Sequence, residues 1–386
     1  MGPLAGVKVI EIAGLGAAPY GCMMLADMGA DVVRVDRVGG GETPEHSPLL
    51  RNRRSIALDL KQPRGRDITL AMVEKADVLI EAFRPGVAER LGIGPEACFA
   101  RNARLIYARM TGWGQTGPLA QTAGHDLNYI GLTGLLHQIG QTGGKPVVPL
   151  NVIGDFGGGG LLLAFGVVCA LWEARQSGRG QIVDAAMIDG ALSFMAMSFG
   201  FREQGQFADR TGSHMLGGGA HYYDTYETQD GLHLAVAPIE PQFYREFLET
   251  MGLAGGRWRD AGYPAYSART TDSDWPTLKR ELAQIFKTKT RDAWCALFAG
   301  TDACVTPVLT LQEAALHPHN LARNAFIEVE GVEQNAPAPR FSRTVPAHPT
   351  APRQSGSGRQ EVLADWGVDL ELLSKSGGRD DAISDV

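Results

Sequence analysis

Residues 7–35 read VKVIEIAGLGAAPYGCMMLADMGADVVRV, and their pattern decides the fold of the first third of the chain. The β-branched run Val7–Ile12 predicts a buried strand, and Gly14–Pro19 is a cluster of turn residues. Tyr20–Met28 has a helical composition and is followed by a glycine, a common end to a helix. Val32–Val35 predicts the next strand. Strand, helix and strand in this order indicate a parallel βαβ unit.

The same alternation continues along the chain. It predicts helices at Arg64–Lys75, Pro85–Gly92, Leu161–Arg175 and Met187–Phe201, and strands at Val78–Phe83, Leu105–Met110 and Ile182–Ala185. Residues 112–160 are rich in glycine and turn residues, which is typical of binding loops on a rigid scaffold. The sequence therefore predicts an α/β fold with a doubly wound parallel sheet.

The pattern changes after about residue 202. Asp230-Gly231, between His221–Glu227 and Leu232–Val236, is a hairpin signal. Helices follow at Pro241–Met251, Trp275–Lys287 and Arg291–Ala299, then a proline-rich extended stretch, Ala336–Pro352, and a weak helix, Gln360–Trp366. We expect a large domain over 1–200 that is completed by 331–386, a linker over 201–221, and a smaller α+β domain over 222–330.

Composition excludes several classes of protein. The chain has 386 residues, 44% hydrophobic and 20% charged, so it can bury a sizeable core. Its net charge of −7 disfavours a global nucleic-acid or anionic-membrane binder. Its five cysteines are scattered without C-x-x-C spacing, which argues against a zinc site or a disulfide framework and fits a reducing compartment. The apolar segment Phe156–Trp172 is short for a membrane span, so a buried helix and a cytoplasmic protein are expected.

The turn after the first strand invites comparison with a dinucleotide-binding motif. Gly14-x-Gly16-x-x-Pro19 opens a helix, and Asp36 follows about 20 residues beyond. The third position of that motif requires a small residue for helix–strand packing, and here it is proline. A plain tight turn into a helix is the better interpretation.

Basic residues cluster after the second and later strands. They are Arg37, Arg51, Arg53, Arg54, Lys61, Arg84 and Arg90. Arginines at the carboxyl ends of parallel strands suggest recognition of an anionic ligand such as a phosphate. A solvated face with scattered salt bridges explains the same spacing equally well.

Three further residues are candidates for chemistry. His125 lies with Asp126 in a glycine-rich loop outside any amphipathic pattern. Asp155 precedes Phe156 and four consecutive glycines that run into an apolar helix, more glycines than a helix cap needs. Their backbone N–H groups would stabilise developing negative charge on a substrate. Glu240 begins another helix, and a purely structural role as the N-cap of that helix would also explain it.

Taken together, these segments resemble the family III CoA-transferase superfamily and, within it, the racemases of 2-methylacyl-CoA thioesters. The resemblance covers most of the chain, from Pro3 to about Arg343. It is carried by Leu25–Val33, Leu50–Arg54, Asp77–Glu81, Phe83–Gly86, Ala108–Gly114, Gly124–Asp126, Gly154–Gly159 and Ile239–Tyr244.

The resemblance implies a Rossmann-like large domain, a smaller second domain and an interlocked homodimer. Each site would lie between the large domain of one chain and the small domain of the other. The positions that match the family's CoA site are Arg37, Arg51, Leu58, Asp59, Leu60, Lys61, Ala82, Phe83, Arg84, Arg90, Gly124, Asp126, Leu127, Asn128 and Tyr129. The basic cluster is thereby assigned to the CoA phosphates.

The resemblance also implies a mechanism. Racemisation removes one α-proton and returns another to the opposite face, so two acid/base groups must flank the α-carbon. His125 and Asp155 are the expected pair, and Glu240 would hold the imidazole in one tautomer. The expected substrate is a 2-methylacyl-CoA, and no metal or redox cofactor is required.

Two alternatives stay open at this point. A family III CoA-transferase would use Asp155 as a covalent nucleophile that forms an anhydride, and it would leave His125 without an evident role. A non-catalytic acyl-CoA-binding protein would have kept the pocket alone. The presence of His125, Asp155 and Glu240 together favours the racemase.

Overall fold

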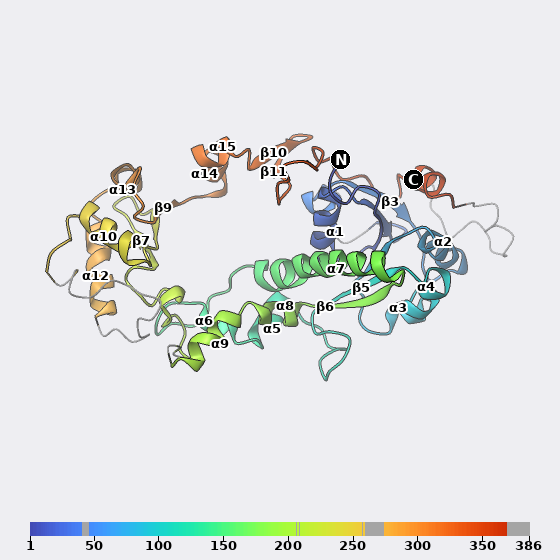
Figure 1. Ribbon diagram of the computed structural model, residues 1–386, viewed down its shortest axis with the longest axis horizontal. Coiled ribbons are helices and arrows are strands. Elements are labelled where there is room, and N and C mark those ends of the chain that lie inside the picture. The colour runs from blue at the N-terminus through green and yellow to red at the C-terminus, as the bar shows by residue number, and fades with distance from the viewer. Residues whose placement is uncertain (41–45, 206, 208, 257, 259–273, 369–386) are drawn as a thin grey trace. The chain divides into compact units, whose positions relative to one another are not determined.

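The computed structural model describes residues 1–40, 46–205, 207, 209–256, 258 and 274–368 (Figure 1). The chain divides into two compact units. The first comprises Met1–Thr133, Leu150–Ser193 and the described residues from Ala322 onward, and the second comprises Gly134–Pro149 and Phe194–Leu321. This division differs from the expected domain boundaries. Residues 134–149 and 194–200 and the expected linker 201–221 join the second unit, and the first unit resumes at Ala322, nine residues before the expected 331.

A six-stranded parallel sheet forms the centre of the first unit. Its strands are β1 (Lys8–Ile12), β2 (Asp31–Asp36), β3 (Arg53–Ala57), β4 (Val78–Glu81), β5 (Ile106–Thr111) and β6 (Gln181–Ala186). They lie in the order β3-β2-β1-β4-β5-β6, which is the doubly wound arrangement with β1 and β4 at the switch point. The α/β fold predicted from residues 7–35 is confirmed.

Helices cover both faces of this sheet because its strands are apolar on both sides. Ile10, Val33 and Leu79 pack on one face with α2 (Pro63–Val73), α4 (Pro95–Arg101) and α16 (Arg359–Asp365). Val9, Val32 and Ile80 pack on the other face with α1 (Ala17–Asp27) and α7 (Leu162–Ser177). The other described elements of this unit are α3 (Val87–Arg90), α5 (Asp126–Gly131), the π-helical segment η2 (Val152–Leu161), α8 (Met187–Ser193), η1 (Pro48–Leu50), β10 (Phe326–Val329) and β11 (Val332–Asn335).

The second unit has a core of aromatic side chains beside a small antiparallel sheet. The sheet contains β7 (Asp224–Glu227), β8 (His233–Val236) and β9 (Val305–Val308), and the hairpin predicted at Asp230-Gly231 joins the first two. Among the described residues of this unit, the helices are α6 (Leu135–Gln138), α9 (Ala196–Glu203), α10 (Pro241–Thr250), α12 (Trp275–Phe286), α13 (Arg291–Phe298) and α14 (Leu311–Leu316), with η3 at Met215–Gly217. α15 (Pro318–Ala322) follows where the chain returns to the first unit.

Two expectations about local structure are wrong. The helix expected over Met187–Phe201 is broken into α8 and α9, with Phe194 and Met195 between them. The stretch 112–160 is not all loop, because it contains α5, α6 and a π-helical segment, Val152–Leu161, that continues into α7. The sequence did not predict these helical turns because the stretch is rich in glycine, which has a low helix propensity.

Three arginines of the predicted basic cluster are used in structural ion pairs. Arg51 is fully buried, and its guanidinium donates to Asp27 at 2.5 and 2.9 Å and to Gln334 at 2.9 Å. Arg53 is likewise buried against Glu11 at 2.5 Å. Arg54 pairs with Asp31 and Asp365, each at 2.7 Å. The expectation that Arg51 contacts CoA is therefore wrong, because its donors are turned into the protein and fix the β10–β11 hairpin to α1.

The Arg51–Asp27 pair predicts a specific stability defect. Arg51→Met would leave the Asp27 carboxylate buried without its partner, which costs about 3–5 kcal/mol. Urea unfolding of the two proteins measures the difference. The matched control is Arg101→Met, which breaks the exposed pair with Glu74 and should cost about 1 kcal/mol or less. Equal losses in the two variants would contradict a buried structural role for Arg51.

Candidate active site

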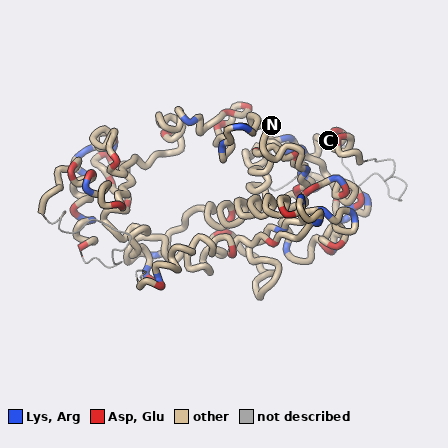
Figure 2. Tube along the Cα trace, in the orientation of Figure 1, with Lys and Arg blue, Asp and Glu red and all other residues tan. Residues whose placement is uncertain are grey.

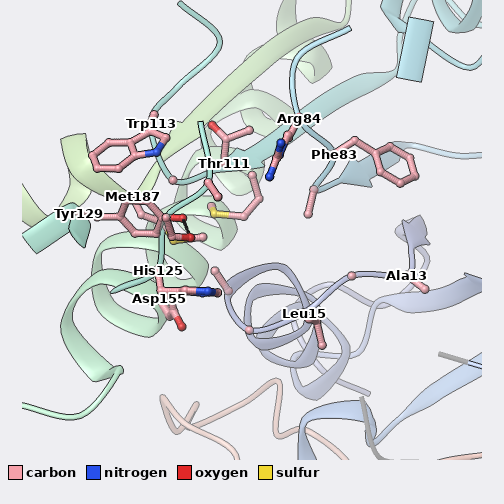
Figure 3. A pocket seen from close by; sticks show the side chains of 18 of the residues that line it. Ala13, Leu15, Phe83, Arg84, Thr111, Trp113, His125, Tyr129, Asp155 and Met187 are labelled. Atoms are coloured by element: carbon pink, nitrogen blue, oxygen red, sulfur yellow. Dashed lines mark hydrogen bonds between the residues drawn. The ribbon is translucent and has the colours of Figure 1, made fainter. Parts of the chain in front are cut away.

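A cavity of about 650 Å³ opens at the carboxyl ends of the parallel strands in the first unit. It is lined by Ala13–Ala17 after β1, by Arg34, Asp36 and Arg37 at the end of β2, by Ala82–Pro85 after β4, and by Met110–Trp113 at the end of β5. His125, Tyr129, Asp155 and Met187 complete the wall shown in Figure 3. The crevice beyond the strand ends at a switch point is where doubly wound sheets bind ligands.

His125 and Asp155 lie beside each other on one side of this cavity (Figure 3). Asp126, the first residue of α5, connects His125 to the π-helical segment that carries Asp155, because its Oδ2 accepts the Asp155 backbone N–H at 2.7 Å. Asn128 holds the other side of the turn, since its Oδ1 accepts the His125 backbone N–H at 3.0 Å. The two side chains that were predicted to flank the substrate are thus placed together by hydrogen bonds to their own backbone N–H groups.

Asp155 occupies a partly buried environment within the π-helical segment. Burial raises the pKa of its carboxyl above the usual value, and the negative charge of Asp126 adds to this. A hydrogen bond from Asn151 Nδ2 at 3.1 Å and the nearby His125 oppose the rise. A raised pKa makes the protonated form of this carboxyl more accessible, which favours a group that must donate a proton as well as accept one.

The glycines after Asp155 allow close packing, and the role expected for their N–H groups stays a prediction. A Cβ at Gly160 would lie 2.5 Å from the Ala17 carbonyl oxygen, and one at Gly158 would lie 2.7 Å from the Ala191 nitrogen. The N–H of Asp155 itself is already donated to Asp126. Asp155 also does not cap an α-helix, because π-helical turns begin before it at Val152. Such π-helical turns are frequent at functional sites.

Gly16, in the turn between β1 and α1, lies close to the Asp155 carboxylate. Its φ is +63°, and a Cβ there would come within 3.3 Å of the Asp155 Oδ2. Tyr20 stacks on Phe156 with ring centroids 4.8 Å apart and so fixes α1 against the same segment. The glycine pattern near residue 14 therefore makes room for the Asp155 carboxylate, which agrees with the tight-turn interpretation.

The predicted CoA-site residues divide into two groups. Those that line the cavity are Arg37, Ala82, Phe83, Arg84, Gly124 and Tyr129. Those that do not line it are Arg51, Leu58, Asp59, Leu60, Lys61, Arg90, Asp126, Leu127 and Asn128. Leu58 belongs to the hydrophobic core, and Lys61, Arg90 and Leu127 are exposed to solvent. Glu240 is described in the second unit, where it precedes α10 without a side-chain capping bond.

Some cavity residues were not predicted. Trp113 packs edge-on against Tyr129, with ring centroids 4.8 Å apart, and its indole N–H is buried without a protein partner. Asp36 accepts hydrogen bonds from Arg34 at 2.9 Å and from Ser55 at 2.5 Å. Met110, Met187 and Ser355 also line the cavity. The rule that ligands bind beyond the carboxyl ends of parallel strands would have found the residues that follow β2 and β5.

Comparison with known proteins agrees with this architecture. Residues 4–356 match the family described as CoA-transferase family III. The chain is 44% identical to the α-methylacyl-CoA racemase of Mus musculus and 42% identical to that of Homo sapiens, in each case over 96% of this chain and 95% of the relative. A crystal structure of a CAIB/BAIF family protein from Brucella suis, 26% identical, superposes with a TM-score of 0.80 over 95% of this chain and 99% of that one. The chain therefore belongs to CoA-transferase family III.

Proposed function

We propose that this protein racemises 2-methylacyl-CoA thioesters by removing and returning the α-proton. The observation that carries the proposal is the juxtaposition of His125 and Asp155 in one cavity of a chain 44% identical to the mouse racemase. Each group would serve as the base for one enantiomer and as the acid for the other. Proton transfer alone needs no metal or redox cofactor, so CoA enters only as part of the substrate.

The cavity supports an acyl-CoA as the ligand. Arg37 and Arg84 present cations at its wall, and phosphates of CoA are the matching anions. The pantetheine arm would then pass the Ala82–Pro85 segment toward His125. A thioester carbonyl at Asp155 and His125 would place the α-carbon between the two groups.

A CoA-transferase remains the second candidate because family members of that class act through a carboxylate. In this protein Asp155 would attack the thioester carbonyl, form an acyl anhydride and release the CoA thiolate. The thiolate would then attack the aspartyl carbonyl of this anhydride, which releases the donor acid and leaves an Asp155–CoA thioester. The acceptor carboxylate would attack that thioester to form a second anhydride and free the thiolate again. Attack of the thiolate on the acceptor's acyl carbonyl would give the new acyl-CoA and regenerate Asp155. That mechanism gives no proton-transfer role to His125, whereas racemisation uses it directly.

A homodimer is the proposed assembly. An exposed apolar stripe begins at Leu161, the last residue of the π-helical segment, and continues along α7 through Phe165, Val168 and Trp172. Phe165 and Trp172 are 64% and 67% exposed. Residues 152–177 are long and apolar enough to cross a membrane by length and composition alone, with a mean hydropathy of 1.8. A second copy of the chain covering the stripe is the simpler explanation, and Glu240 of the partner subunit would complete the site.

The first functional prediction concerns solvent exchange. In deuterated water, either pure enantiomer of a 2-methylacyl-CoA should gain deuterium at the α-carbon and converge on a near-equal mixture. Chiral chromatography with mass spectrometry follows both events. The same reaction with an added free acid is the control. Transfer of CoA to that acid at a comparable rate, with retained configuration, would favour the transferase instead.

The two bases can be separated by substitution. Asp155→Asn should remove proton abstraction from one face, so one enantiomer should exchange α-deuterium faster than it racemises. His125→Ala should give the mirror pattern, and Glu240→Gln should slow both directions. Losses of about 10²–10⁴ in racemisation rate are expected. Wild-type racemisation by both single variants, or hydroxylamine trapping of an acyl group on Asp155, would exclude the two-base mechanism.

The dimer has its own test. Phe165→Glu with Trp172→Glu should convert the wild-type dimer to monomer in sedimentation velocity, because burying two carboxylates in an apolar interface is strongly unfavourable. The control is Glu173→Gln, which changes an exposed polar residue of the same helix. A wild-type monomer, or wild-type protein that sediments with neutral lipid vesicles, would contradict the proposed assembly.

A further inference from the structure

A charged cluster lies behind the Ala82–Pro85 wall of the cavity. Glu81 is the last residue of β4 and is only 2% exposed. Arg109 is its register partner on β5, with its Nε 3.2 Å from Glu81 Oε1. The same guanidinium also pairs with Glu89 on α3. Two carboxylates from either end of one cavity wall therefore meet on a single arginine.

Side chains of this cluster and of the loop after β5 hydrogen-bond to the backbone of the Ala82–Pro85 wall. Glu81 Oε2 accepts the N–H of Phe83 at 2.7 Å, and Phe83 lines the cavity. Arg109 Nη1 donates to Gln115 Oε1 at 2.9 Å, which connects the cluster to the loop after β5. Gln121 Nε2 donates to the Pro85 carbonyl at 3.1 Å from that same loop. The Ala82–Pro85 wall is thus joined to the loop after β5 in two ways, through Arg109 and directly through Gln121.

Burial of the Glu81 charge opposes folding, because it removes a carboxylate from water. Burial raises the pKa of Glu81 to about 7, despite the opposing effects of the Phe83 N–H and of Arg109. The other charged groups that act on this carboxyl are Glu89 and Asp184, and both raise its pKa further. Apolar side chains of similar size usually stabilise such a site at least as well as a buried ion pair does. A role other than stability would explain why charged groups occupy this position.

We propose that Glu81 and Arg109 are positioning residues for the CoA moiety of the substrate. They hold Ala82–Pro85 in the conformation that presents Arg84 and the adjoining backbone to the ligand, and they do not touch the reacting atoms. The inference rests on the proposed acyl-CoA function. It predicts that damage to the cluster weakens binding and leaves the proton-transfer step intact.

Paired substitutions of Glu81 test the hydrogen bond to Phe83. Glu81→Gln keeps an oxygen that can accept the Phe83 N–H, so its Kd for CoA should stay within about threefold of wild type. Glu81→Leu removes the acceptor and should weaken CoA binding about tenfold, as expected for one lost hydrogen bond of this kind. Isothermal titration with free CoA measures both values, and kcat at saturating substrate should change less than twofold.

Arg109→Lys provides a second variant in case Glu81→Leu folds poorly. A lysine cannot bridge Glu81, Glu89 and Gln115 together, so a CoA Kd about five- to tenfold above wild type is expected. Arg101→Lys, at an exposed pair, is the control and should bind as wild type does. Thermal unfolding is recorded for every variant, so that a loss of stability can be separated from a loss of affinity.

Three results would overturn the inference. They are unchanged CoA affinity in Glu81→Leu and Arg109→Lys, equal weakening by Glu81→Gln and Glu81→Leu, and a fall in kcat with the CoA Kd unchanged. CoA binding needs no turnover, so the measurement does not depend on racemisation. A wild-type protein that binds CoA without exchanging α-protons would contradict the proposed racemase function. The comparison of CoA affinities among the variants would still test whether Glu81 and Arg109 are positioning residues.

Discussion

The close contact between the glycine-lined π-helical segment and helix α1 is the constraint on which the site depends. Gly158, Gly159 and Gly160 are buried, and a side chain on Gly160 would collide with the Ala17 backbone. Because the segment lies so close to α1, Asp155 reaches the turn that follows β1, where Gly16 leaves space for its carboxylate. Protein interiors tolerate little extra volume, so larger residues here would displace the acid itself.

Among the arginines of the first unit, some are paired inside the protein and others lie at the cavity wall. Arg51 and Arg53 are buried, and each forms an ion pair with a carboxylate inside the scaffold. Arg37 and Arg84 lie at the cavity wall, where a ligand can reach them. The same residue type therefore stabilises the fold in one place and offers a binding charge in another. Burial and the available partners decide which role an arginine takes.

A racemase and a CoA-transferase could both use the Asp155 carboxylate, but in different chemical roles. A carboxylate in the place of Asp155 can act as a nucleophile or as a base, and its raised pKa favours the exchange of a proton. What distinguishes the racemase is the imidazole beside it. Asp126 joins His125 to the π-helical segment through a single backbone hydrogen bond, so the pairing of His125 with Asp155 is built into the backbone.

The sequence by itself determined five of the six strands of the parallel sheet and the β7–β8 hairpin, because runs of apolar residues and turn signals are local and periodic. Strand β3, in which two arginines and a serine precede the apolar pair Ile56-Ala57, was not predicted. Family motifs also identified His125 and Asp155 as candidates, and that assignment of chemistry stays a prediction. Only the tertiary structure decided that Arg51 is a buried structural cation, that Asp155 lies within π-helical turns, and that Glu81 anchors Phe83. Spacing along a chain does not specify which distant group will meet a charge. Partners such as Asp27 and Gln334 reach Arg51 from 24 and 283 residues away, and only folding brings them together.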